Sequence, residues 1–207
     1  MTQNKPILGI ILAGGQARRM GGGDKCLLPL GGRTLLQRSI DKATPQVDHL
    51  LLSANGNQLR FARSGLTVLP DEYPDFPGPL AGIHAGLSWL KSHRPESEWL
   101  VSFAADTPFF PPDLVERLYD AAQSAQATVA VASSEGRMHP IFALWHHSLL
   151  EPVSEALRGE HSPRLQDWVR AQNAVEVSFH NAGFDPFFNI NHPQDLYNAE
   201  ALLPLTD

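Results

Sequence analysis

An apolar run at residues 7–12 opens directly into a glycine-rich loop that ends at residue 25, and this junction constrains the fold more than any other feature. The run is far shorter than a membrane helix and has the length of a buried β-strand. The loop carries Arg18, Arg19 and Lys25. Because glycine has no Cβ, backbone N–H groups and these fixed charges can approach a phosphate closely. The junction therefore predicts a strand that leads into a nucleotide-binding loop.

Two standard phosphate-binding patterns do not fit this loop. In a P-loop the lysine is followed by Ser or Thr, whereas Lys25 is followed by Cys26. The G-x-G-x-x-G spacing of a dinucleotide-binding turn is also missing. A glycine-rich loop alone is equally well explained as a solvent-exposed connection between a strand and a helix. The three cations in the same loop favour anion binding over that simple connection.

The charge distribution indicates a compact anion as the partner. The formal net charge is −6, but residues 13–38 hold five Lys or Arg against one Asp, so this stretch is +4 and the remainder is −10. A nucleic-acid or anionic-membrane binder usually presents a broad basic face, so both classes are disfavoured. We expect a nucleoside triphosphate rather than a long polyanion.

The chain has a single cysteine, Cys26, which excludes an intrachain disulfide and a thiolate zinc site. We interpret it as a small buried hydrophobe, because no histidine lies nearby in sequence to act as its base. A reducing cytoplasmic location fits this cysteine usage. No segment approaches the ~20 apolar residues that a membrane helix needs, so we expect a soluble protein without a membrane partner.

Short apolar runs alternate with helical patterns along the chain, which is typical of βα units and a mostly parallel sheet. With 207 residues and no repeat or linker, we expect one α/β domain over residues 1–207, with a Rossmann-like sheet and helices on both faces. Helix starts are predicted at Thr34 with Gln37, at Pro111 to Asp113, at Ser162 with Pro163, and at Asn191 with Gln194. Strands are predicted at residues 7–12, 47–53, 66–69, 99–104, 128–132, 139–145 and 175–179.

The predicted strands at 128–132 and 139–145 break this alternation, because no helical pattern separates them. They meet at the turn-rich stretch 133–137. A hairpin at this point would add antiparallel strands to a parallel sheet, so we expect a mixed α/β architecture.

An acidic residue follows each of two predicted strands. In open α/β sheets ligands bind beyond the carboxyl ends of the strands, so Asp106 is expected at the same edge as the glycine loop. A single carboxylate suffices to hold Mg²⁺ against phosphates, because magnesium keeps several waters. Asp71 offers a second acceptor at that edge. Both aspartates are also common turn residues, Asp106 with Thr107 and Asp71 before Pro74, and those structural roles stay open.

Three further residues are weaker candidates for the same cleft. His139 opens a strand after a glycine turn, although an ordinary core or surface histidine is favoured. Asn189 and Asn191 have strand spacing and could point to one side, but Asn191 is more simply explained as a helix N-cap. The nine histidines show no metal-ligand spacing.

In chain order, these segments resemble a known family. Leu-Ala-Gly-Gly at 12–15, Arg-Met-Gly at 19–21 and Asp-Lys at 24–25 resemble the signature of nucleotidyltransferases with the nucleotide-diphospho-sugar transferase fold. The resemblance narrows to molybdenum cofactor guanylyltransferases and runs from residue 7 to about residue 203. The segments that resemble this narrower family are Pro-Gly-Pro-Leu-Ala-Gly at 77–82, Asp-Thr-Pro at 106–108, His-Pro at 139–140 and Asn-Ile-Asn at 189–191. This family transfers GMP from GTP to Mo-molybdopterin and releases diphosphate.

The resemblance also implies roles for individual residues. Lys25 would bind phosphate, Asp71 would help to hold guanine or ribose, and Asp106 would bind Mg²⁺. Arg19 would offset charge as diphosphate leaves, so Arg19, Lys25 and Asp106 form the implied catalytic set. The first half of the domain would bind GTP and the second half the pterin, with molybdenum-insertion proteins and recipient molybdoenzymes as implied partners. The implied nucleotide-binding residues are Leu12, Ala13, Gly14, Gly15, Lys25, Asp71 and Asp106.

One position departs from the family pattern. Ser53 stands where the family often has asparagine, so the resemblance does not assign a contact between this side chain and the nucleotide. Asn55 lies two residues further on and could face the same way. Gly14 favours guanine, since relatives that transfer CMP to the same pterin tend to carry Leu-Ala-Ala-Gly at this loop. The alternatives are such a cytidylyltransferase, a sugar-phosphate nucleotidyltransferase, and a non-catalytic GTP-binding carrier of the cofactor.

Overall fold

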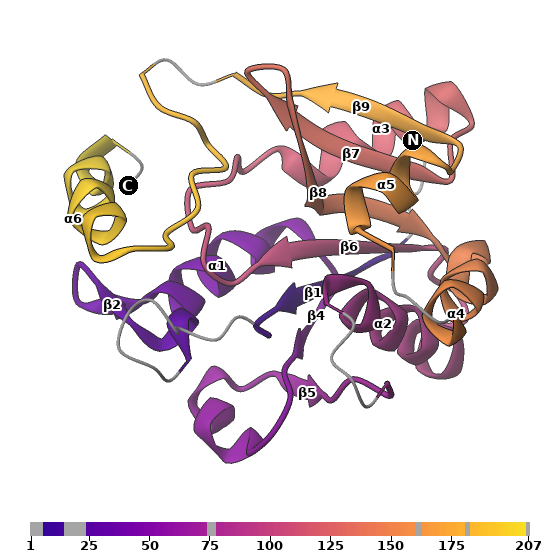
Figure 1. The fold of residues 1–207 in the computed structure, drawn as a ribbon, viewed down its shortest axis with the longest axis horizontal. Coiled ribbons are helices and arrows are strands. Elements are labelled where there is room, and N and C mark those ends of the chain that lie inside the picture. The colour runs from indigo at the N-terminus through magenta and orange to yellow at the C-terminus, as the bar shows by residue number, and fades with distance from the viewer. Residues whose placement is uncertain (1–5, 15–23, 74–77, 160–162, 181–182, 206–207) are drawn as a thin grey trace.

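The computed structural model describes residues 6–14, 24–73, 78–159, 163–180 and 183–205. Its centre is a seven-stranded sheet in the order β5-β4-β1-β6-β8-β7-β9 (Figure 1). Each of these strands overlaps one predicted from the sequence, so the mostly parallel α/β class is confirmed. The strands are Ile7–Leu12 (β1), His49–Ser53 (β4), Thr67–Leu69 (β5), Trp99–Ala104 (β6), Val129–Ser134 (β7), Arg137–His146 (β8) and Ala174–Ser178 (β9).

Among the described strands of this sheet, β8 alone runs against the others. It pairs antiparallel with β6 and β7, whereas β1 pairs parallel with β4 and β6, β4 with β5, and β7 with β9. The predicted hairpin is therefore β7–β8. Glu135 and Gly136 at its tip have φ of 50° and 75°, as a tight hairpin turn of the I′ type requires. Because β8 runs opposite to its neighbours β6 and β7, its amino end lies at the edge of the sheet where the other strands end.

Helices cover both faces of the sheet, as predicted. The α1 and α3 helices contribute to one hydrophobic cluster, and α2, α4 and α5 contribute to a second cluster on the opposite face. A further helix, α6, lies to one side, against the short hairpin of β2 (Pro29–Leu30) and β3 (Arg33–Thr34) (Figure 1). In the parts of the chain that the structure describes, no helix is long and apolar enough to cross a membrane. The helices are Leu35–Ala43 (α1), Pro79–His93 (α2), Leu114–Ala125 (α3), Leu150–Arg158 (α4), Leu165–Arg170 (α5) and Pro193–Leu202 (α6).

The predicted helix starts have different outcomes. Thr34 caps α1 through its hydroxyl, which accepts a hydrogen bond from the Gln37 N–H at 3.1 Å. At α6 the prediction of Asn191 as N-cap is wrong, because His192 and Asp195 form the capping box one position later. Asp113 precedes α3 as predicted. Ser162 lies outside the described residues, and the residue before α5 is Arg164.

Two glycines allow α2 to pack unusually close to the sheet. A Cβ on Gly82 would lie 2.6 Å from the Ser53 hydroxyl and 2.8 Å from Leu12 Cδ2. A Cβ on Gly86, one turn later, would lie 2.8 Å from Leu100 Cδ2. Real Cβ contacts do not come this close, so a Cβ at either position would force the neighbouring side chains to shift. The first turns of α2 are thereby held against the carboxyl ends of β1 and β4.

Candidate active site

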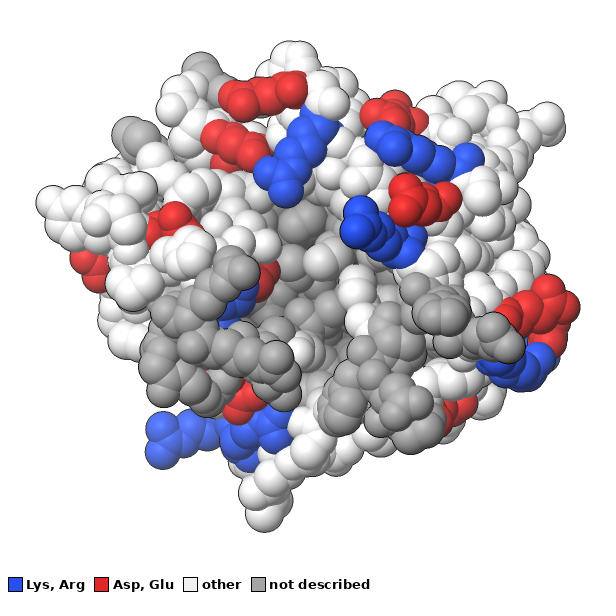
Figure 2. Space-filling model, viewed as in Figure 1, with Lys and Arg blue, Asp and Glu red and all other residues white. Residues whose placement is uncertain are grey.

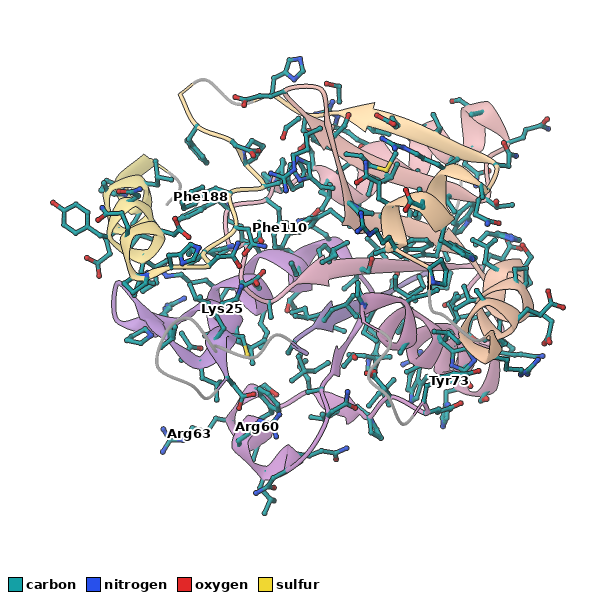
Figure 3. All side chains as sticks on the ribbon, viewed as in Figure 1. Lys25, Arg60, Arg63, Tyr73, Phe110 and Phe188 are labelled. Atoms are coloured by element: carbon teal, nitrogen blue, oxygen red, sulfur yellow. The ribbon has the colours of Figure 1, made fainter. Side chains whose placement is uncertain are left out.

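Lys25 and Asp106 form an ion pair at the edge of the sheet where β1 and β6 end. The Lys25 ammonium lies 2.5 Å from Asp106 Oδ2, and the two side chains are only 11% and 19% exposed. The same ammonium donates to the amide oxygens of Asn191 at 2.6 Å and Asn189 at 3.5 Å. Figure 3 labels Lys25 and Phe188 on the same side of the molecule, Phe188 on the segment that leads to α6. The predicted pair is thus brought together, and both weaker asparagine candidates point to it.

Backbone hydrogen bonds fix the position of Asp106. The Ala105 N–H donates to the Leu12 carbonyl at 3.2 Å, which continues the pairing of β6 with β1 past the end of the strand. The Asp106 carbonyl accepts from the Ile190 N–H at 3.1 Å. Its side-chain Oδ1 accepts from the Thr107 hydroxyl at 3.2 Å, so the local contact with Thr107 and the ion pair with Lys25 coexist.

The residue before Lys25 is anchored by an arginine that the sequence did not single out. Asp24 Oδ2 lies 2.5 Å from Arg60 Nε, and this side chain also donates to the carbonyls of Asn55 at 2.5 Å and Asn57 at 2.7 Å. The Arg60 guanidinium further lies 4.5 Å from the centre of the Phe61 ring. Arg60, in the 3₁₀ segment Gln58–Ser64, therefore ties the end of the glycine loop to the chain after β4. Because 36 residues separate Asp24 from Arg60 in the sequence, no local pattern could have revealed the pair.

Asp71 is held by two polar residues at the carboxyl end of β4, Ser53 within the strand and Asn55 just after it. Asn55 Nδ2 donates to Asp71 Oδ2 at 2.6 Å, and the Asp71 N–H donates to Asn55 Oδ1 at 2.8 Å. The Ser53 hydroxyl donates to Asp71 Oδ1 at 3.4 Å. Ser53 and Asn55 therefore face the same way. Their polar groups orient the Asp71 carboxylate at the ends of β4 and β5.

The end of β1 supplies further candidates. The Ala13 N–H donates to the Ser53 carbonyl at 2.9 Å, and the Leu12 carbonyl accepts from Ala105, so these two groups belong to the sheet. A Cβ on Gly14 would meet no described atom within 4 Å. No packing in the described structure therefore requires glycine at this position. Gly15, Arg18 and Arg19 lie outside the described residues.

Neither the cysteine nor the candidate histidine is placed to attack a substrate. Cys26 is 3% exposed, and burial, with the Asp24 and Asp106 charges, raises the pKa of its thiol to about 12. It remains a neutral buried side chain, as the sequence predicted. His139 is half-buried, with its ring stacked on Phe187 at a centroid distance of 4.6 Å. Burial lowers the pKa of His139, so this ring is neutral near pH 7.

The charges on one face of the molecule are mixed rather than segregated. Figure 2 shows Lys and Arg interspersed with Asp and Glu on that face. A broad positive surface for a long polyanion is not seen there. Among the residues that the structure describes, no three or more His, Cys, Asp or Glu side chains gather to form a metal site from protein ligands alone.

Comparison with known proteins decides the family. The model of the MobA-like NTP transferase domain matches residues 9–176. A molybdenum cofactor guanylyltransferase of Mesorhizobium japonicum is 49% identical over 202 residues, which cover 96% of this chain and 97% of the relative. One of Nitrobacter hamburgensis is 46% identical over 200 residues, with coverage of 97% and 96%. The chain belongs to the molybdenum cofactor guanylyltransferase family. It is a nucleotidyltransferase, as the sequence motifs predicted.

Solved structures agree with this family on the fold. Molybdopterin-guanine dinucleotide biosynthesis protein A of Archaeoglobus fulgidus has a TM-score of 0.76 at 22% identity, with 96% of this chain and 99% of that chain covered. A CMP:2-keto-3-deoxy-manno-octonic acid synthetase complexed with CTP has a TM-score of 0.75 at 13% identity, with coverage of 97% and 99%. The predicted nucleotidyltransferase fold is confirmed by both.

Proposed function

We propose that this protein transfers GMP from GTP to Mo-molybdopterin, which yields the guanine dinucleotide form of the cofactor and diphosphate. The observation that carries the proposal is the Lys25–Asp106 pair, buried at the carboxyl edge of the sheet in a chain 46–49% identical to guanylyltransferases. At this edge of the sheet, a nucleoside triphosphate requires a cation for its phosphates and a carboxylate for its metal counter-ion.

The transfer needs no general base. The terminal phosphate oxygen of molybdopterin, already anionic, attacks the α-phosphorus of GTP. A new P–O bond forms, the bond from the α-phosphorus to the bridging oxygen breaks, and diphosphate leaves with that electron pair. Lys25 stabilises the charge that develops on the phosphates, and Arg19 is proposed to do the same for the leaving diphosphate. Positioning and electrostatics therefore suffice, which agrees with the protonated, buried thiol of Cys26.

Asp106 is the residue that would hold Mg²⁺. The fit rests on its donor set: one carboxylate, partly exposed and paired with a lysine that has two other acceptors. Magnesium binds through one or two protein carboxylates together with waters and substrate phosphates, so a single aspartate meets the requirement. The bound ion would neutralise phosphate charge. Asp106 would hold the ion, and Lys25, positioned by Asn191, would contact phosphate.

The remaining nucleotide contacts are proposed for the ends of β1 and β4. Leu12 and Ala13 have a carbonyl and an N–H already bonded within the sheet, so their other backbone groups, together with Gly14 and Gly15, would contact the nucleotide. The open space at Gly14 supports close approach of the ligand. Asp71, oriented by Asn55, would accept from the ribose or guanine.

The wider cellular role follows from this reaction. We place the pterin in the second half of the domain and expect molybdenum-insertion proteins and recipient molybdoenzymes as partners. A cytoplasmic location agrees with the free thiol of Cys26.

Product analysis tests the proposal. The protein is incubated with Mg²⁺, Mo-molybdopterin and either GTP or CTP, and the dinucleotide and diphosphate are quantified. We expect product with GTP at least about tenfold faster than with CTP, since a site that hydrogen-bonds one base rejects the other. Preference for CTP would indicate the cytidylyl alternative. A nucleotide sugar from GTP and a hexose 1-phosphate would indicate the sugar-phosphate alternative, and GTP binding without turnover would indicate a carrier.

A further inference from the structure

A partly buried polar cluster near the tip of the β7–β8 hairpin has no role in the reaction described above. Ser134 is 2% exposed, and its hydroxyl lies 2.6 Å from His139 Nε2 and 2.8 Å from Asp185 Oδ1. The hairpin supplies Ser134 and His139, whereas Asp185 belongs to the segment that crosses from β9 to α6 (Figure 1). We propose that Ser134, His139 and Asp185 position residues 185–191 so that Asn189 and Asn191 meet Lys25.

The hydrogen bonds of the cluster have a defined direction. A serine hydroxyl has a single proton, and the Asp185 carboxylate can only accept, so Ser134 donates to Asp185. The remaining bond of the hydroxyl must therefore be accepted from His139, which requires the proton of the neutral ring on Nε2. The Phe187 N–H donates to the same Asp185 Oδ1 at 2.9 Å. Each proton has one assigned acceptor, so the three side chains lock together in one arrangement.

The cluster is continuous with the active site through the backbone. The Phe188 N–H donates to the Asp185 carbonyl at 3.1 Å, and the Phe187 ring stacks on His139. The Ile190 N–H then donates to the Asp106 carbonyl, next to the Lys25 ion pair. The short segment is thus held at one end by the hairpin and at the other by the active site.

Burial of Ile190 alone does not orient its neighbours. Ile190 is fully buried in a third cluster with Leu30, Leu35, Phe109 and Ala199, whereas Asn189 and Asn191 are exposed on either side of it. The Asn191 N–H donates to Asp195 Oδ2 at 2.8 Å, so the start of α6 fixes the segment after Ile190. Asp185 supplies the fixed point before Ile190, on the side of Asn189, and with both ends held the two amide oxygens are directed at Lys25. The three residues are positioning residues, because none of them touches the reacting groups.

The molecule contains a matched control for this cluster. His84 Nε2 lies 3.0 Å from the Ser154 hydroxyl between α2 and α4, and Ser154 is 4% exposed. This is the same pair of residue types at similar burial, with no connection to residues 185–191. Ser154→Ala therefore also removes a buried contact between serine and histidine, together with the bond that Ser154 donates to the Leu150 carbonyl at 2.8 Å, without touching the segment.

The first readout needs no substrate. Amide hydrogen exchange is followed at Ile190 and Phe187 in the full-length protein. We expect Ser134→Ala, and independently Asp185→Asn, to accelerate exchange at both amides about tenfold, as loss of one buried hydrogen bond allows, with the amides of β1 unchanged. Ser154→Ala should leave Ile190 and Phe187 protected. Unchanged protection of Ile190 in both Ser134→Ala and Asp185→Asn would overturn the proposal.

The second readout uses turnover and rests on the proposed GMP transfer. Ser134→Ala should lower kcat about tenfold in the wild-type background but have little further effect in an Asn191→Ala background, because the segment then has less to position. A purely structural role would give fully additive losses and would contradict the inference. If the wild-type protein makes no product from GTP and molybdopterin, the proposed function fails, while the exchange readout still decides the positioning role.

Discussion

Asp106→Asn separates the charge of the active-site carboxylate from its shape. Asparagine keeps the size of the side chain and can still accept from Lys25, but it removes the negative charge 2.5 Å from the ammonium. Loss of one preorganised electrostatic contact slows a reaction by about 10²–10³-fold, so we expect kcat/KM for GMP transfer to fall in that range. This corresponds to about 2.7–4 kcal/mol of lost transition-state stabilisation.

The same substitution should cost less in stability. Removing one partner of a fully buried ion pair costs about 3–5 kcal/mol, because the other charge remains unpaired. Lys25 here keeps Asn189 and Asn191 as acceptors, and both charged side chains retain some exposure. We therefore expect a loss of about 1–3 kcal/mol, typical of a hydrogen bond to a charged group. For a domain of this size that lowers Tm by about 2–12 °C.

The assay measures diphosphate release with GTP, Mg²⁺ and Mo-molybdopterin, alongside thermal melts. Asp48→Asn is the matched control, because Asp48 accepts from the Ile7 N–H at 2.7 Å at the opposite end of β1. It should lower Tm without changing kcat/KM. If Asp106 served only as counter-ion to Lys25, adding Asp106→Asn to Lys25→Met would cost no further activity. That outcome, or more than about a tenth of wild-type kcat/KM in Asp106→Asn alone, would refute the role assigned to this carboxylate.

Three further predictions follow from the packing and the titrating groups. Gly82→Ala places a Cβ 2.6 Å from the Ser53 hydroxyl, and calorimetric titration should show GTP binding weakened at least about tenfold. The Cβ of Gly86→Ala would instead meet the side-chain tips of Leu100 and Ile10, so this substitution should lower Tm and leave the GTP Kd unchanged. Burial lowers the pKa of His49, His84 and His139 from the ordinary 6.5, so the unfolded chain binds more protons than the folded chain below that pH. The contribution of these histidines to folding stability should therefore be complete above pH 6.5 and fall as the pH drops. A urea midpoint that is unchanged between pH 7.5 and 5.5 would contradict this. The Cys26 thiol, with its pKa raised to about 12, should resist iodoacetamide at pH 8 in the native protein and react after denaturation in urea, as mass spectrometry would show.

The strands were predictable because each is short, apolar and bounded by turn residues. Buried strands of a parallel sheet have no polar face, so residues 7–12 and 99–104 stand out as continuous apolar runs. The hairpin was predictable because Glu135-Gly136 separates two such runs without a helix between them. Helices α2 and α4 and the β2–β3 hairpin were not predicted. Pro79 in the first turn of α2 and the Gly31-Gly32 pair, with φ of 53° and 78°, were the local signals available for two of these.

The candidate site was predictable only where its residues follow strands. Asp106 and Asp71 could be placed at one edge by the rule that the carboxyl ends of parallel strands meet there. Arg60 and Asp185 could not, because their contacts join segments that periodicity leaves unconnected. Asn191 shows the limit most clearly. Its position before a helix predicted an N-cap, but His192 and Asp195 satisfy the helix start and leave the Asn191 side chain for Lys25.

The contact between Lys25 and Asn191 joins residues 166 positions apart. It therefore links the half of the domain proposed to bind GTP with the half proposed to bind the pterin. Lysine has about 2 kcal/mol of rotamer entropy, and an ammonium held by Asp106 alone would keep part of that freedom. The asparagines reduce that freedom, so in the proposed reaction the phosphates of GTP would meet a cation already in place, and preorganisation of this kind lowers the cost of binding and of reaction. The crossing segment is therefore proposed to support the nucleotide site as well as to belong to the half proposed to bind the pterin. Any substitution that displaces residues 185–191 should weaken GTP turnover through Lys25, even where it leaves the glycine loop intact.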